Sequence, residues 1–201
     1  MNTLKIHLIR HGATDANYKG EYIGCRTDIP LAPEGLTELR MLKEDIEYPE
    51  IQRLYSSPML RCRQTGAVLY PDMEIVPVEE LKEYDFGSFE GKTAAELEND
   101  PDFVPWTSGK LAAPKGGEAN SEFIKRVCLG FNKIAVDMVN SGITSSAVIM
   151  HGGAIMMLLA AAGLPRRSPV EWTSDFGRGY SLLVTPSLYF KSGAVEVYDI
   201  I

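Results

Sequence analysis

The sequence has few histidines and cysteines and no excess of positive charge. Three of its 201 residues are histidines, His7, His11 and His151, and three are cysteines. Lysine and arginine together number 20 against 27 aspartates and glutamates, so the formal net charge is −7. Proteins that bind nucleic acids or anionic membranes carry a basic surface. We therefore expect neither a nucleic-acid nor a membrane partner.

The cysteines form no recognisable pattern. Cys25, Cys62 and Cys128 are widely separated, and none belongs to a CxxC pair. Disulfide frameworks and zinc sites need paired or closely spaced ligands, so we expect reduced thiols, no metal and no cofactor. The N-terminal segment also lacks the sustained apolar run of a signal peptide. We expect a cytoplasmic protein.

The sequence has one long apolar run, AVIMHGGAIMMLLAAAGL, at residues 147–164. Its length would suffice for a membrane span. However, His151 and two glycines interrupt the run, and Gly163 and Pro165 close it. We interpret it as a buried strand, a tight turn and a buried helix of a soluble protein.

Short β-rich runs alternate with helical periods along the chain, which is typical of an α/β sheet. Strands are predicted at 3–10, 53–56, 74–78, 146–150, 180–185 and 194–198. Helices are predicted over 33–46 and 119–140, after His151, and from Pro58 with Ser57 as its N-cap. The length fits a single domain covering residues 1–201.

The regular alternation stops at about residues 80–120. Thr93 and Glu96 have the spacing of a capping box and predict a short helix from Thr93. Residues 100–120 then contain three prolines and three glycines and show no clear period. We expect an insertion that forms a cap or lid over a site, with a mobile surface excursion as the alternative.

Two segments, LKIHLIRHG and SAVIMHGG, are apolar strands that each end in His-Gly. Ligands of open α/β sheets bind beyond the carboxyl ends of the strands. We therefore expect His11 and His151 at one edge of the sheet, where the neighbouring glycines let backbone amides approach an anion. His7 lies within its strand and is predicted to be structural.

Two arginines are predicted at the same edge. Arg61 falls in the first turn of a helix that follows a strand, where free amides and the helix dipole attract anions. Arg10 directly precedes His11, and both guanidinium groups match the geometry of phosphate oxygens. Together with the histidines they predict a phosphate site. The alternative is that Arg10 and Arg61 form surface salt bridges.

Six ordered segments carry a resemblance to a known family. They are LIRHGATDAN, YIGCRTDIPLAPEG, YSSPMLRCRQT, LKEYDFGSFEG, PKGGEANSEFIKR and VIMHGG. In this order they resemble the histidine phosphatase superfamily, also called phosphoglycerate-mutase-like, from the first strand to about residue 155. The resemblance implies a three-layer α/β/α sandwich with a mostly parallel central sheet, in which the insertion is part of a small cap.

The resemblance also implies roles for individual residues. His11 matches the nucleophile that accepts the phosphoryl group as a phosphohistidine, a covalent intermediate that divides the displacement into two steps. Arg10, Arg61 and His151 match the groups that bind the phosphate and offset its charge. Glu83 matches the catalytic acid and base.

On chemistry alone Asp85 and Glu90 are rivals of Glu83, because they lie close to it in the sequence. A carboxyl group that acts as an acid near neutrality needs a raised pKa, which burial under a lid would supply. The substrate-binding candidates are Asn17, Ile23, Gly24, Arg26, Tyr84 and Gly152. An ordinary turn role is the alternative for Asn17.

The residues after Glu83 separate two branches of the family. Mutases carry an Arg-His pair there, whereas this chain has Tyr84-Asp85-Phe86-Gly87 and looks like the phosphatase branch. Its length resembles that of alpha-ribazole phosphatases and broad-specificity phosphatases. The expected activity is that of a metal-independent histidine acid-type phosphatase, a phosphoric monoester hydrolase for small phosphorylated metabolites, with alpha-ribazole phosphate among the candidate substrates. A phosphoglycerate mutase and a catalytically degenerate phospho-ligand binder are the alternatives. The sequence does not predict an oligomeric state.

Overall fold

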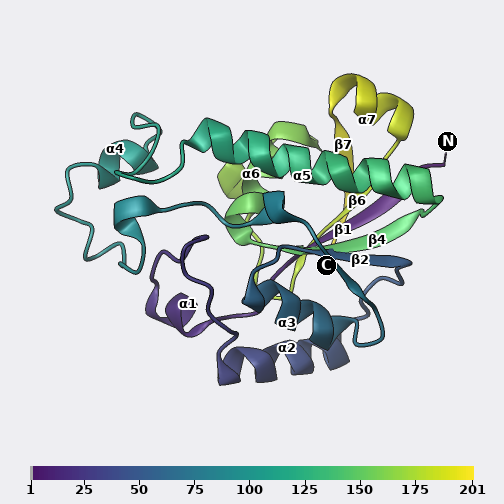
Figure 1. The fold of residues 1–201 in the computed structure, drawn as a ribbon, viewed down its shortest axis with the longest axis horizontal. Helices are drawn as coiled ribbons and strands as arrows, with labels where there is room; N and C mark the ends of the chain where they lie inside the picture. Colours follow the sequence, from purple (N-terminus) through teal and green to yellow (C-terminus); the bar gives the residue numbers. More distant parts are fainter. Residues whose placement is uncertain (1) are drawn as a thin grey trace.

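The computed structural model describes residues 2–201, which form a seven-stranded mixed sheet with helices on both faces (Figure 1). The strands are β1 (Leu4–Arg10), β2 (Arg53–Ser56), β3 (Ile75–Pro77), β4 (Ser145–Met150), β5 (Gly163–Leu164), β6 (Gly179–Val184) and β7 (Val195–Ile200). Their order is β3-β2-β4-β1-β6-β7-β5. The first four strands in this order are parallel, and β6 is antiparallel to both of its neighbours.

Helices cover the sheet because its central strands are apolar on both sides. In β1, the alternating side chains of Leu4, Ile6 and Leu8 pack into a core beneath α5 (Asn120–Ser141) and α6 (Gly152–Ala162). Ile9 points into a second core beneath α2 (Pro33–Asp45) and α3 (Leu60–Leu69). Figure 1 shows these helix pairs on opposite sides of the strands. The predicted α/β/α sandwich is confirmed.

The long helix α5 illustrates how the sequence pattern sets an element. Its buried side chains recur at helical spacing and comprise Phe123, Val127, Gly130, Phe131, Ile134, Ala135 and Met138. The helix ends at Ser141, and Gly142 follows with φ +69°. Glycine adopts this left-handed conformation without steric cost. The predicted helix over 119–140 is therefore confirmed to within one residue at each end.

The prediction that Ser57 caps a helix beginning at Pro58 is wrong. Helix α3 begins at Leu60, and Met59 is its N-cap residue. The Leu60 amide donates to the Asp28 carboxylate at 2.6 Å, while the Ser57 hydroxyl contacts His151 instead. A cap from a distant loop replaces the local one because Ser57 is used elsewhere.

The predicted helix from Thr93 is also wrong. The capping-box contacts form, since the Thr93 amide donates to Glu96 at 2.8 Å and the Glu96 amide donates to the Thr93 hydroxyl at 3.3 Å. The backbone nevertheless remains in turns. Leu97 is the one buried side chain within 93–99, so there is no apolar face along which packing could extend a helix.

Residues 80–120 form short elements joined by loops. These elements are η1 (Glu79–Leu81), η2 (Gly87–Phe89) and α4 (Phe103–Thr107). In Figure 1, α4 lies at the same end of the molecule as α1 (Asp15–Lys19) and the start of α6. The segment thus lies near the carboxyl ends of the parallel strands. Its closure as a lid stays a prediction.

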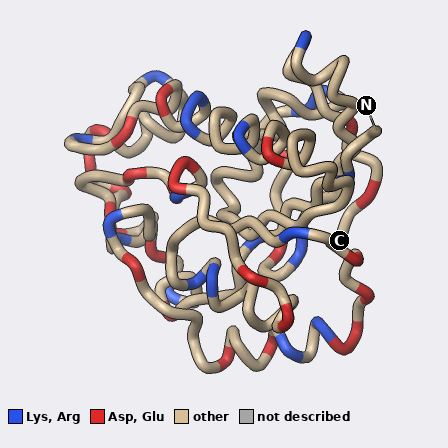
Figure 2. The backbone as a smooth tube through the Cα atoms, turned by 45° about the vertical axis from the view of Figure 1, so that its right-hand side comes forward, with Lys and Arg blue, Asp and Glu red and all other residues tan. Residues whose placement is uncertain are grey.

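Further elements that the sequence did not predict include α1, α7 (Pro186–Ser192) and η3 (Pro169–Trp172). Helix α7 connects β6 and β7 and packs on α5 through Tyr189 and Phe131, whose rings lie 5.7 Å apart. Within residues 2–201, no helix combines the length and the apolar character needed to cross a bilayer. Acidic and basic residues are dispersed along the chain (Figure 2).

Candidate active site

The candidate site lies where three neighbouring parallel strands end. His11 follows β1, Ser57 follows β2 and His151 follows β4. Because β1 and β2 both pair with β4, these residues lie at one edge of the sheet. The rings of His11 and His151 lie 5.2 Å apart, edge to face. The structure thus brings together the two histidines that the sequence placed at strand ends.

His11 is held in one tautomer. Its side chain is 5% exposed, and Nδ1 lies 2.7 Å from the carbonyl oxygen of Gly12. A carbonyl oxygen can only accept, so Nδ1 carries the proton and Nε2 of the neutral ring has a free lone pair. The Gly12 amide donates to the Thr65 hydroxyl at 2.9 Å, which ties this loop to α3.

The surroundings of His11 keep its ring neutral. Burial lowers its pKa to about 3, and the nearby Arg61 and Arg10 cations lower the pKa further while the bond to Gly12 opposes them. Desolvation and positive neighbours both disfavour the imidazolium ion. At neutral pH His11 is therefore an uncharged imidazole close to two cationic side chains.

Arg61 lies at the second position of α3 and is 2% exposed. Its Nη1 donates to the Thr27 carbonyl and its Nη2 to the Gly24 carbonyl, both at 3.2 Å. A guanidinium tied to backbone carbonyls keeps its full charge, because its partners are neutral. The alternative of a surface salt bridge for Arg61 does not fit this burial.

Gly24 makes this arrangement possible. A Cβ at this position would lie 1.9 Å from the Tyr84 carbonyl oxygen, so no other residue fits the space. The Gly24 amide donates to Glu90 at 3.0 Å, and the Cys25 amide donates to the Tyr84 carbonyl at 3.2 Å. Gly24, predicted to bind substrate, contacts Arg61 through its carbonyl.

Arg10, which directly precedes His11, is the second cation that acts on its ring. Its Nη1 donates to the Ser174 carbonyl at 2.6 Å, and its buried Nε has no hydrogen-bond partner among the described residues. A Cβ on Gly152 would lie 3.1 Å from this Nε, so the glycine leaves room for the guanidinium. Burial lowers the pKa of Arg10, but an arginine remains a cation.

His151 is the N-cap residue of α6 and is fully buried. Its Nε2 lies 2.9 Å from the Ser57 hydroxyl and 3.5 Å from Cys62 Sγ. Burial and the charge of Arg61 hold its pKa well below the ordinary value, so this ring is also neutral. Burial raises the pKa of the Cys62 thiol, which therefore stays protonated.

Glu83 is the carboxylate that the structure brings to the histidine edge. It is 8% exposed, and its two oxygens accept from the amides of Tyr84 at 2.9 Å and Gly153 at 3.3 Å. Burial raises its pKa, and these amides together with Arg61 and Arg10 limit the rise. A buried carboxyl group with a raised pKa can donate a proton near neutrality.

The rival carboxylates have other partners. Asp85 pairs with Arg26 through two contacts, at 2.7 and 2.9 Å, and also accepts from the Gly87 amide. Glu90 accepts from Gly24 as described above. Geometry therefore favours Glu83 over both as the group next to the histidines.

The remaining predicted substrate-binding residues differ in how many of their polar groups are hydrogen-bonded within the protein. Asn17 Oδ1 accepts from the amide and hydroxyl of Thr14 and so caps α1, which leaves its Nδ2 as a donor for a ligand. Arg26 joins the loop at 22–28 to Asp85 and to the Gly116 carbonyl. Ile23 is half-buried beside Gly24.

Tyr84, next to Glu83 in the chain, belongs to an aromatic cluster. Its hydroxyl donates to the Glu118 carbonyl and accepts from Trp106 Nε1 at 3.2 Å. The other rings of this cluster are Tyr22, Phe86, Phe89, Phe103 and Trp106. This cluster holds the insertion against Tyr22, which lies in the loop that precedes α2.

Sequence reasoning missed three residues around the histidines. Ser57 was assigned to a helix cap but contacts His151, and Thr65 was not singled out but binds the Gly12 amide. Phe176 lies with its ring 6.0 Å from that of His11. The polar residues lie in the segment 55–65 already recognised, whereas Phe176 lies beyond the quoted motifs, and no pattern in the sequence connects it with residue 11.

His7 is separate from the site. Its Nδ1 lies 2.8 Å from the Ser181 hydroxyl, directly across the strand pair β1 and β6. This contact fits the structural role predicted for it. Across residues 2–201, no group of three or more histidine, cysteine, aspartate or glutamate side chains is arranged to hold a metal ion.

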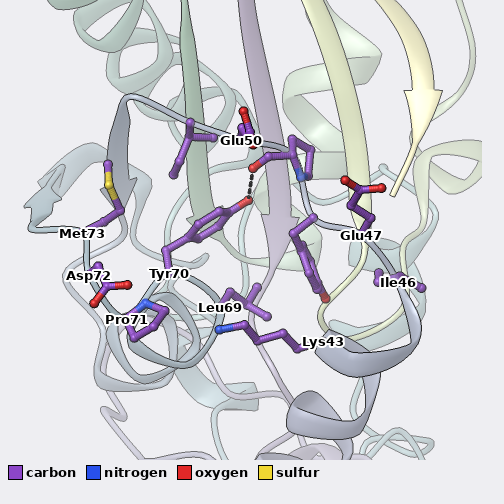
Figure 3. Close-up of a pocket in the computed structure, with 12 residues that line it drawn as sticks. Lys43, Ile46, Glu47, Glu50, Leu69, Tyr70, Pro71, Asp72 and Met73 are labelled. Carbon is purple, nitrogen blue, oxygen red and sulfur yellow. Dashed lines mark hydrogen bonds between the residues drawn. The ribbon is translucent and has the colours of Figure 1, made fainter.

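A cavity of about 620 Å³ lies at the opposite end of the parallel strands, between the end of α2 and the turn after α3 (Figure 3). Two of its polar side chains have backbone partners, since Tyr70 donates to the Pro49 carbonyl at 3.2 Å and Lys43 donates to the Val68 carbonyl at 2.8 Å. None of the predicted site residues lines it. It is not part of the candidate site.

The chain is similar to curated phosphatases. It is 33% identical over 170 residues to a Hydrogenobacter thermophilus protein provisionally named phosphoserine phosphatase 2, covering 80% of each chain. It is 29% identical over 165 residues to a broad-specificity phosphatase of Saccharomyces cerevisiae, covering 79% of this chain and 70% of the relative.

Solved structures share the fold. The alpha-ribazole phosphatase of Shigella flexneri superposes with a TM-score of 0.78 at 22% identity, covering 97% of this chain and 95% of the other. A phosphoglycerate mutase of Bacillus anthracis gives 0.78 at 19% identity, covering 98% and 92%. The model of one family, described as the histidine phosphatase superfamily (branch 1), matches residues 6–175, which extends the resemblance past residue 155. The chain belongs to this superfamily.

Proposed function

We propose that this chain is a metal-independent phosphomonoester hydrolase that works through a phosphohistidine at His11. The observation that carries the proposal is the bond from His11 Nδ1 to the Gly12 carbonyl, which leaves Nε2 unprotonated inside a buried, cationic pocket. Phosphoryl transfer depends mainly on positioning and on charge stabilisation, and Arg10 and Arg61 can supply both.

In the first step, His11 Nε2 attacks the phosphorus atom and the bond from phosphorus to the ester oxygen breaks. The electron pair of that bond goes to the leaving oxygen, which takes a proton from the Glu83 carboxyl group. Arg10, Arg61 and His151 hold the phosphoryl oxygens during the transfer. The step yields a free alcohol, phosphorylated His11 and a Glu83 carboxylate.

In the second step, water replaces the alcohol. The Glu83 carboxylate takes a proton from the water, whose oxygen attacks phosphorus as the bond to His11 Nε2 breaks. Inorganic phosphate leaves, and both His11 and Glu83 return to their starting protonation states. The amides of Tyr84 and Gly153 support this alternation, because they bind Glu83 in its charged form.

We propose small phosphorylated metabolites as the substrates. The names of the relatives refer to phosphoserine, to alpha-ribazole and to broad specificity, and all of these concern phosphate monoesters. The aromatic rings above Glu83 favour a leaving group with an apolar or ring-shaped part. Alpha-ribazole phosphate fits this description and heads the panel of compounds to test. The free state of all three cysteines suits a cytoplasmic enzyme.

The test is hydrolysis of p-nitrophenyl phosphate in excess EDTA. We expect full activity of the wild type and a loss of at least about 10⁴-fold in His11→Ala, because the nucleophile is absent. His7→Asn is the matched control, since it removes a histidine from the same strand away from the site. EDTA-sensitive turnover, or comparable activity of wild type and His11→Ala, would contradict the proposal.

A further inference from the structure

We propose that Phe176 is a positioning residue for Arg10, and that the turn Asp175–Arg178 completes the phosphate pocket. This inference rests on the proposed function, because it assigns Arg10 to the phosphate. It adds to the pocket a segment that follows α6 and precedes β6, outside the motifs that carry the histidines and Arg61.

The guanidinium of Arg10 is held from two directions. The Phe176 ring covers one face, with its centroid 3.9 Å from Arg10 Cζ. The Ser174 carbonyl accepts from Nη1 at 2.6 Å. A cation over an aromatic face is stabilised by the ring's negative face, most strongly where water is excluded. These contacts fix both the plane and the direction of the guanidinium.

The contacts that hold the Arg10 guanidinium suit a group that must bind an anion. Within residues 2–201 no carboxylate forms an ion pair with Arg10. An ion pair would neutralise the guanidinium and occupy its donors. An aromatic face and one carbonyl restrain Arg10 but leave its charge and its Nε donor for a phosphate oxygen.

The turn that carries Phe176 is tied to the backbone of Arg10. The Arg10 amide donates to the Arg178 carbonyl at 2.9 Å, and the Gly177 amide donates to the Arg10 carbonyl at 3.0 Å. The Arg178 amide donates to the Asp175 carbonyl at 3.1 Å and closes the turn. Phe176 therefore cannot move independently of Arg10.

The far side of the turn is anchored to α2 and to the loop that follows it. Tyr48 donates its hydroxyl to the Gly177 carbonyl at 2.6 Å. Gly177 has φ +73°, and a Cβ there would lie 2.8 Å from the side chains of Leu39 and Leu42. The turn is thus built around a residue that must be glycine, and this glycine aims the preceding Phe176 at Arg10.

The experiment measures kcat and KM for p-nitrophenyl phosphate, with the affinity for inorganic phosphate by calorimetry. Phe176→Leu keeps an apolar side chain but removes the aromatic face, and Phe176→Tyr keeps that face. We expect Phe176→Leu to lower kcat/KM and phosphate affinity by about 10-fold, and Phe176→Tyr by less than about 3-fold. Phe190→Leu, on exposed α7, is the matched control and should leave both unchanged.

A double-mutant cycle separates positioning from a general structural effect. In an Arg10→Ala background, we expect Phe176→Leu to change kcat/KM by less than about 2-fold, since its partner is gone. The same 10-fold loss in both backgrounds, or no loss in the wild-type background, would overturn the inference. If the wild type hydrolysed no phosphomonoester, the proposed function would fail, and the calorimetric affinities would still decide the role of Phe176.

Discussion

The floor of the candidate site and the predicted cap are held by different interactions. The floor, which comprises His11, Arg61 and His151, is at most 5% exposed, and its polar atoms bond to backbone carbonyls or to buried hydroxyl groups. The predicted cap, at about residues 80–120, is held by packed aromatic rings and by the pair of Arg26 and Asp85, whose side chains are 51% and 24% exposed.

The difference indicates that the floor and the predicted cap have separate functions. Groups fixed by backbone and burial cannot adapt, so they suit a reaction centre that is the same for every phosphate monoester. Aromatic packing and half-exposed ion pairs tolerate rearrangement, so they suit the part that meets the variable leaving group. We expect floor substitutions to slow all substrates and cap substitutions to change their ranking.

The largest effect is expected for Arg61→Ala, which removes a buried cation from the floor. The loss of one preorganised donor costs about 10²- to 10³-fold in kcat, and we expect the upper part of this range for every substrate. Arg63→Ala on the same helix is the control, because Arg63 is exposed. A loss of activity restricted to some substrates would show that Arg61 affects substrate choice, which is the behaviour expected of the cap.

Glu83→Gln is expected to have an effect that depends on the leaving group. An alkyl phosphate needs a proton on its leaving oxygen, so its kcat should fall by about 100-fold or more, while p-nitrophenyl phosphate should lose less than about 10-fold. Rate measurements on a series of leaving groups test this. Equal losses across the series would show that Glu83 is not the acid.

The pH profile sharpens the same assignment. Burial raises the pKa of Glu83, and the protonated form is the acid, so kcat/KM for alkyl phosphates should fall as the pH rises through that pKa. Glu83→Gln should lack this limb. Persistence of an identical limb in the variant would assign it to another group.

A smaller effect is expected for Asp85→Asn, which weakens the contact of the cap with Arg26. Half-exposed ion pairs contribute about 0.2–1 kcal/mol, so we expect KM for bulky substrates to rise by about 2- to 5-fold with kcat for p-nitrophenyl phosphate retained. Glu79→Gln, whose partner is Lys82, is the matched control. A uniform fall in kcat would contradict the division between floor and cap.

The smallest effect concerns stability rather than turnover. Burial lowers the pKa of His7 to about 4 in the folded chain against 6.5 in the unfolded chain. The unfolded state therefore binds more protons between these values, so stability from this group is complete above pH 6.5 and is lost as the pH falls toward 4. We expect thermal unfolding midpoints of His7→Asn to decline less steeply over this window than those of the wild type. Parallel declines would exclude this contribution.

Much of the site could be predicted from the sequence because parallel strands end at one edge. His11 and His151 each follow an apolar strand, and this alone predicts their proximity. The roles of Ser57 and Asp28 could not be predicted. The local sequence favours Ser57 as the cap of α3, but Asp28 from another loop accepts from the Leu60 amide, and Ser57 contacts His151. The pairing of Phe176 with Arg10 joins positions far apart in the chain, and no local pattern encodes such a contact.

The cap was the least predictable region. Its boundaries followed from the loss of periodicity, but the capping box at Thr93 and Glu96 formed without a helix. Arg26 was predicted to bind substrate, and its pair with Asp85 could not be predicted from the sequence. Side chains in irregular segments have several partners within reach, and tertiary packing decides among them.

The most direct test of the account is the identity of the phosphorylated residue during turnover. We expect rapid quenching under alkaline conditions, followed by mass spectrometry, to find phosphate on His11 at a substoichiometric level in the wild type and none in His11→Ala. The label should be lost on acid treatment, as expected for a phosphoramidate. Turnover without any phosphorylated protein, or a label on a residue other than His11, would contradict the central claim.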